Sequence, residues 1–174
     1  MIQKTLVTGE VMKLCKSYRS TYEITDFAQK IRINEELEHV ARHGEQPQIL
    51  KFDNIENEIS CIADLINSFK KSDYKSLGII CKTESQAKEI TERLKVFTDD
   101  IYFLSNRSNA FVQGIIVTSA HMAKGLEFDE VIVPQVDNKN YHSEIDRSML
   151  YVAVTRAMHK LTLSYSGKLS EFIR

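Results

Sequence analysis

Residues 114–133 read GIIVTSAHMAKGLEFDEVIV, and this stretch decides the fold class. Its two ends, 114–117 and 131–133, are β-branched runs short enough to be buried strands. A polar, glycine-containing connection joins them, beginning at Thr118. Polar groups that follow a buried strand project from the edge of the sheet at which open α/β folds bind ligands. We therefore expect a ligand site along this connection.

Residues 147–157 read RSMLYVAVTRA and form the second informative stretch. Met149, Val152, Ala153 and Arg156 fall at helical spacing. The pattern predicts a helix over 147–157 that delivers a guanidinium from its end. From the residues alone, this arginine is either a structural salt-bridge donor or a phosphate clamp.

Strands and helices alternate through the rest of the chain. Apolar runs predict strands at 49–52, 77–81 and 101–104, and amphipathic patterns predict helices that begin after Asn54 and after Thr83. We expect Asn54 to cap the first helix, and Thr83 with Gln86 to form a capping box at the second. Residues 160–165 alternate as an edge strand does, and a short helix is expected to follow up to residue 174. Alternation with short connections predicts a mostly parallel sheet covered on both faces, a three-layer α/β fold.

An arginine also precedes the first amphipathic pattern, in residues 16–21, KSYRST. Ser20 with Glu23 fits a capping box, so a helix is expected to begin immediately after Arg19. A helix N-terminus is a place suited to anions. Taken alone, Arg19 would more often be an ordinary surface charge.

Composition limits the classes of function. The chain has 174 residues with 23 Lys and Arg against 24 Asp and Glu, a net charge of −1, so any contact with nucleic acid must be local. The cysteines, Cys15, Cys61 and Cys81, are odd in number and widely spaced, which favours reduced, buried thiols in a cytoplasmic protein. Neither a signal pattern nor an apolar run near the roughly 20 residues of a membrane span is present, so we expect no membrane contact.

The strings TSAHMAKGLEF and LYVAVTRA resemble motifs V and VI of the UvrD/Rep type of superfamily 1 helicases, and KSYRST resembles motif IV. The resemblance implies that residues 1–174 form a single C-terminal RecA-like domain (2A) with the fold of P-loop NTPases. Such domains usually carry an inserted 2B subdomain between motifs IV and V. Here two strand–helix units fill the stretch between Thr21 and Ile116, so we expect the insertion to be missing, as in HelD-type relatives.

The phosphate-binding pattern G-x-x-x-x-G-K-[ST] does not occur in the sequence. Asp129 and Glu130 precede an apolar run instead of following it, so we interpret them as a solvated strand start and not as Walker B carboxylates. The resemblance then implies half of a motor. ATP with Mg²⁺ would be shared with an N-terminal RecA-like domain, and this chain would supply no metal ligand.

The resemblance assigns nucleotide contacts residue by residue. Arg19 and Arg156 match the family arginines that reach the γ-phosphate, for which a planar, permanently charged fork is suited. Glu127 matches the glutamate that hydrogen-bonds the ribose, and Gly125 permits the close backbone approach before it. Lys124 could serve the nucleotide, the nucleic acid or neither.

Two further positions match residues that face single-stranded nucleic acid, namely Thr118 and His121. Hydroxyl and imidazole donors suit backbone phosphates. Taken alone, His121 would more often be a hydrogen-bonded loop histidine.

Two functional classes stay open at this point. The chain could be the C-terminal motor domain of an ATP-dependent DNA helicase or translocase that contacts single-stranded DNA. Alternatively, it could belong to a HelD-type ATPase that remodels or recycles RNA polymerase. Because both classes would use the same pocket, this domain's sequence does not separate them.

Overall fold

The computed structural model describes residues 20–32, 42–106 and 113–173. In this part of the chain, six strands form one parallel sheet in the order β1-β6-β5-β2-β4-β3. The strands are β1 (Gln48–Phe52), β2 (Ser76–Cys81), β3 (Ile101–Phe103), β4 (Gly114–Ser119), β5 (Phe128–Val133) and β6 (Ala157–Ser166). The helices are α1 (Tyr22–Ile31), α2 (Ile55–Phe69), α3 (Glu84–Leu94) and α4 (Glu144–Val154).

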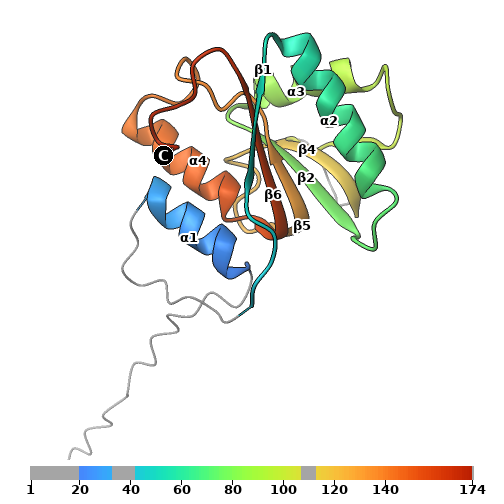
Figure 1. The fold of residues 1–174 in the computed structure, drawn as a ribbon. Coiled ribbons are helices and arrows are strands. Elements are labelled where there is room, and N and C mark those ends of the chain that lie inside the picture. The colour runs from blue at the N-terminus through green and yellow to red at the C-terminus, as the bar shows by residue number, and fades with distance from the viewer. Residues whose placement is uncertain (1–19, 33–41, 107–112, 174) are drawn as a thin grey trace, which may run out of the picture.

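Helices cover both faces of the sheet. Figure 1 shows α1 and α4 together on one face, with α2 and α3 on the other. Two separate apolar cores follow, one including Ile24 and Leu150 and the other including Ile62 and Ile90. This arrangement confirms the predicted three-layer α/β fold with a mostly parallel sheet.

Two of the three predicted N-terminal helix caps are confirmed. The Asn54 side chain accepts a 2.9 Å hydrogen bond from the Asn57 N–H, and Thr83 forms the expected capping box with Gln86. These caps depend only on residues within one turn, which is why local sequence predicts them well.

The predicted capping box at Ser20 is wrong. Helix α1 follows Thr21 as its N-cap, and the Ser20 hydroxyl donates to the Ala157 carbonyl at 2.6 Å. The Glu23 carboxylate accepts from the Gly44 N–H at 2.8 Å. Partners distant in sequence have therefore replaced the local cap. The Ser20 bond ties the start of α1 to the start of β6, and the Glu23 bond ties it to the segment before β1.

The prediction that 160–165 form an edge strand is also wrong. Strand β6 lies between β1 and β5. Its polar residues Thr162 and Ser164 are buried, and the Ser164 hydroxyl donates to the Glu58 carboxylate at 2.6 Å. The alternating pattern reflects a polar contact beneath α2 and not a face turned to water.

The C-terminal segment does not form the predicted short helix. Residues 167–173 are irregular, and Leu169 pairs with Asp137 in an isolated antiparallel bridge. The Ser170 hydroxyl donates to the Tyr141 carbonyl at 2.7 Å. The segment is thus held by contacts to the loop after β5.

Helix α4 begins and ends about three residues earlier than predicted. Ser143 and Asp146 form a capping box at its start, and Thr155 is its C-cap. Arg156 therefore lies in the turn between α4 and β6, and not within the helix.

Both cysteines in the described residues are free thiols, as expected. Cys81 is buried, and burial, followed by the nearby Glu58 carboxylate, raises the pKa of its thiol far above the usual range. Cys61 is only half-buried, so the expectation of a buried thiol is wrong there, and Cys15 lies outside the described residues. Among the helices described, none combines the length and the apolar character needed to cross a membrane.

Candidate nucleotide and nucleic-acid site

The connection between β4 and β5 crosses the sheet from one end to the other. Because both strands run parallel to β2, residues 120–127 must return from the carboxyl end of β4 to the amino end of β5. Two hydrogen-bonded turns shorten this path, with the Ala123 N–H donating to Ser119 and the Leu126 N–H donating to Ala123. Gly125 lies within the second turn with φ +89°, a left-handed conformation that favours glycine.

This crossing separates the predicted site residues into two groups. Thr118 and His121 belong to the carboxyl end of β4, whereas Glu127 directly precedes β5 and lies at its amino end. The expectation that the whole connection lies at the ligand-binding carboxyl edge is therefore wrong for Gly125 and Glu127. A crossover this short could not be inferred from the polar pattern alone.

Arg156 lies at the same amino end and contacts both neighbours of Glu127. Its guanidinium donates from Nη1 to the Leu126 carbonyl at 3.3 Å, and its own carbonyl accepts from the Phe128 N–H at 3.0 Å. Nε donates to Val152 O at 3.1 Å, and Nη2 donates to the Thr155 hydroxyl at 3.2 Å. The residues of motifs V and VI thus meet at the start of β5 and β6.

The start of α1 reaches the same place. Ser20 bonds the Ala157 carbonyl, the residue after Arg156, and the Arg42 guanidinium donates to Met158 O at 2.7 Å. Arg19 itself lies outside the described residues. Of the motif IV string, Ser20 is described, and its hydrogen bond to Ala157 places it beside motif VI.

The nucleotide-contact candidates from motif V lie at the surface. Lys124 and Gly125 are exposed and Glu127 is half-buried. A Cβ added at Gly125 would meet no atom within 4 Å, so the backbone conformation and not the available space requires glycine here. Guanidinium, carboxylate and an open glycine form a donor and acceptor set that fits phosphate oxygens and sugar hydroxyls.

Thr118 is placed differently from the other candidates. It is 0% exposed, and its hydroxyl donates to the Leu104 carbonyl at 2.9 Å. A direct contact with nucleic acid would require this bond to break. The nucleic-acid role of Thr118 stays a prediction, while the geometry gives the hydroxyl a structural bond.

His121 and Lys124 are both exposed and border a hollow of about 180 Å³ between the connection and α4. Apolar side chains of α4, including Met149 and Val152, form its other wall. Ile145 at the start of α4 is 69% exposed. This face combines two polar donors with uncovered apolar surface.

The interpretation of Asp129 and Glu130 as a solvated strand start is wrong. Burial would raise the pKa of Asp129, but the N–H groups of Lys75 and Ser76 and the Ser76 hydroxyl all donate to it and hold its pKa below the usual value. Glu130 is buried, and burial raises its pKa. Both carboxylates serve the sheet, joining β5 to β2 or packing within it. Within the described part of the chain, His, Cys, Asp and Glu side chains form no group able to hold a metal ion.

Comparison with known protein families identifies the class of domain to which this chain belongs. Residues 12–103 and 114–164 each match a family described as the UvrD-like helicase C-terminal domain. The chain therefore belongs to the UvrD-like helicase C-terminal domain family, and its fold is the RecA-like one expected.

Individual relatives agree with this assignment. The C-terminal domain of a possible DNA helicase from Lactobacillus plantarum WCFS1 is 33% identical, with a TM-score of 0.77 over 90% of this chain and 92% of that one. The Gabija protein GajB of Bacillus cereus (strain VD045) is 32% identical over 91% of this chain. The matched region spans only 29% of the length of GajB. The UvsW helicase from bacteriophage T4, at 12% identity and a TM-score of 0.50 over 67% of this chain and 46% of that one, shares the fold.

Proposed function

We propose that this chain is the C-terminal motor domain of an ATP-dependent DNA helicase or translocase that works in the cytoplasm. It would complete an ATP site together with an N-terminal RecA-like domain and contact single-stranded DNA. The observation that supports this proposal is the convergence of three distant segments at the amino ends of β5 and β6. There Arg156 hydrogen-bonds the residues before and after Glu127, and the bond from Ser20 to Ala157 holds the start of α1 beside Arg156.

The residues at this end suit a nucleoside triphosphate. ATP with Mg²⁺ would supply the transferable phosphoryl group, and the phosphate loop and metal ligands would come from the N-terminal domain. Arg156 and Arg19 would address the γ-phosphate, where fixed positive charge opposes the charge that develops during transfer. Glu127 would accept hydrogen bonds from the ribose, with Gly125 and Lys124 beside it.

The surface beside the hollow suits a nucleic-acid strand. His121 and Lys124 are exposed at its border, where they can donate to backbone phosphates. With a net charge of −1, the chain carries no excess of positive charge, so its binding to DNA depends on such local donors. The relatives matched are described as a DNA helicase domain, a helicase and a Gabija protein, and none of these descriptions supports an RNA polymerase partner.

The test is ATP hydrolysis by the complete motor, that is, this chain together with the N-terminal domain. We expect turnover that single-stranded DNA stimulates, and none from the chain alone, which lacks the phosphate-binding pattern. Robust Mg²⁺-dependent turnover by the chain alone would contradict the half-motor assignment. A complete motor indifferent to single-stranded DNA would contradict the DNA-translocase assignment.

A further inference from the structure

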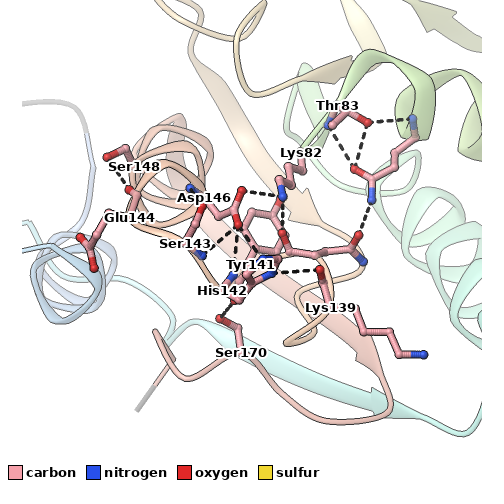
Figure 2. Close-up of polar contacts among 12 residues, drawn as sticks. Lys82, Thr83, Lys139, Tyr141, His142, Ser143, Glu144, Asp146, Ser148 and Ser170 are labelled. Carbon is pink, nitrogen blue, oxygen red and sulfur yellow. Dashed lines mark hydrogen bonds and ion pairs between the residues drawn. The ribbon is translucent and has the colours of Figure 1, made fainter.

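A largely buried ionic junction between Lys82 and Asp146 (Figure 2) lies at the carboxyl end of the sheet, where β2 ends and α4 begins. Lys82 directly follows β2, and its Nζ lies 2.5 Å from the Asn140 carbonyl oxygen and 2.5 Å from Oδ1 of Asp146. The ammonium also lies 5.8 Å from the centre of the buried Tyr141 ring. One side chain at the end of β2 therefore holds both the loop before α4 and the first turn of α4.

Asp146 connects this junction to the first turn of α4. Its side chain is only 7% exposed, and Oδ2 accepts from the N–H groups of His142 and Ser143 at 3.2 and 3.0 Å. Burial would raise the pKa of Asp146, but Lys82 and these N–H donors outweigh burial and hold it well below its usual range. The carboxylate is thus ionised and depends on Lys82 for its countercharge.

The junction also touches the start of the motif V connection. The residue before Lys82, Cys81, accepts a 2.8 Å hydrogen bond from the Ala120 N–H, and His121 follows directly. On the other side, the Gln86 side chain of the α3 capping box donates to Asn140 Oδ1 at 2.8 Å. The ends of β2 and β4 and the starts of α3 and α4 therefore share one set of contacts.

Helix α4 spans the distance from this junction to the nucleotide side. Its eleven residues extend about 16 Å, with Asp146 in the first turn and Arg156 two residues beyond the last. At the far end, Arg156 Nε donates to Val152 O, so the guanidinium is anchored on the helix itself. A shift of the helix start would consequently move the arginine.

We propose that Lys82 is a positioning residue that couples the nucleic-acid side of the domain to Arg156 through α4. The coupling rests on the function proposed above. A DNA strand that contacts His121 would shift the neighbouring Ala120, whose hydrogen bond to Cys81 would in turn shift Lys82. Through its ion pair, Lys82 would transmit that displacement to Asp146 and the start of α4. An ammonium suits the task because it donates in several directions and is strongly attracted to a buried carboxylate.

The experiment compares Lys82→Met with Lys70→Met in the complete motor, with oligo(dT) as the probe strand. Lys70 is the matched control, because it pairs with Asp100 and Thr98 at the opposite end of the sheet. We expect Lys82→Met to reduce oligo(dT)-stimulated kcat on the order of tenfold or more, since a small misplacement of a catalytic group costs this much. The KM for ATP and the affinity for ADP should stay within about twofold, because Glu127 is not carried by α4.

Restoring the charge provides the second measurement. Lys82→Arg should recover part of the stimulated rate, whereas a purely space-filling role would let methionine serve as well as arginine. If Lys82→Met does not fold, as judged by its thermal melt, the double variant Lys82→Met with Asp146→Asn leaves no unpaired buried charge and carries the same expectation.

The outcomes separate the two proposals. If the parental motor shows DNA-stimulated turnover and a folded Lys82 variant matches Lys70→Met in kcat, the coupling role is wrong and the proposed function stands. If a Lys82 variant instead changes KM and ADP affinity as strongly as kcat, Lys82 acts on general stability of the site and the coupling role is again wrong. A parental motor without DNA-stimulated turnover overturns both.

Discussion

The two ends of the sheet are built in different ways. At the amino ends of β5 and β6, Arg156 and Glu127 lie at or near the surface, and main-chain groups anchor the guanidinium. At the carboxyl ends, Lys82 and Asp146 are largely buried and held by each other. The amino end thus leaves charged groups near the surface, whereas the carboxyl end fixes the start of α4, the helix that precedes Arg156. Mutations at the two ends should therefore have different effects on ATP turnover, ligand affinity and stability.

The largest effect is expected at the amino end. Arg156→Ala in the complete motor should reduce ATP turnover by about 10³-fold or more, the effect of losing an arginine that stabilises phosphoryl transfer. ADP affinity should be nearly unchanged, because ADP lacks the γ-phosphate. Arg19→Ala should behave alike, and the double variant should be little worse than the poorer single one, since both would act on one group. Steady-state kinetics with parallel ADP titrations measure all three.

Glu127→Ala is the contrasting control within the same site. We expect the KM for ATP to rise and ADP affinity to fall, each by about tenfold, because losing hydrogen bonds to a charged group costs about 1.5 kcal/mol and the ribose is common to both nucleotides. Should Arg156→Ala lose ADP affinity as badly as Glu127→Ala, the arginine would revert to a structural role at the end of α4.

Gly78→Ala should disturb the packing behind the amino end of β5. A Cβ at Gly78 would lie 2.6 Å from Cδ2 of the buried Phe128 ring, directly beside Glu127 in sequence. Overpacking of this kind destabilises by about 1–3 kcal/mol. Urea unfolding followed by circular dichroism would measure the loss, and adding Phe128→Leu should recover part of it. An unchanged midpoint would show that the ring can move aside.

Thr118→Val and Lys124→Ala separate buried from exposed polar groups in motif V. Thr118→Val should cost roughly 1 kcal/mol of stability through the lost bond to Leu104, with unchanged affinity for single-stranded DNA. Lys124→Ala should leave stability unchanged, weaken binding several-fold and reduce the log–log salt slope by about 0.7. Fluorescence anisotropy across a salt series tests both. Weaker DNA binding by Thr118→Val would show that the hydroxyl turns outward when a strand binds.

The smallest effect concerns a second buried carboxylate at the carboxyl end, Glu58. It is 0% exposed, and although Ser164 and the Gln135 N–H donate to Oε1, burial dominates and raises its pKa above 4.5. Since the folded state binds this proton more tightly than the unfolded state, the stability that Glu58 contributes is lost as pH rises from about 4.5 through the folded-state pKa. Glu58→Gln should remove this dependence. Urea unfolding of both proteins at pH 5 and pH 8 would show it, and parallel pH slopes would contradict it.

Sequence patterns predicted what depends on neighbours in the chain. The caps at Asn54 and Thr83 were correct because their donors and acceptors lie within one helical turn. The edge-strand prediction for 160–165 failed because the alternation of Thr162 and Ser164 looks the same whether a polar residue meets water or a buried carboxylate. The Ser20 cap failed because a carbonyl 137 residues away competed for the hydroxyl.

By itself, the sequence determined the three-layer α/β fold and the helicase family. Hydrophobic periodicity sets the type of each element, and KGLEF and YVAVTRA are specific strings. Only the tertiary structure decided which end of the sheet each residue occupies. The short crossover through Gly125 moves Glu127 away from His121 and beside Arg156, and packing buries Lys82 against Asp146. Contacts of this kind join residues far apart in the chain, where spacing along the sequence carries no signal.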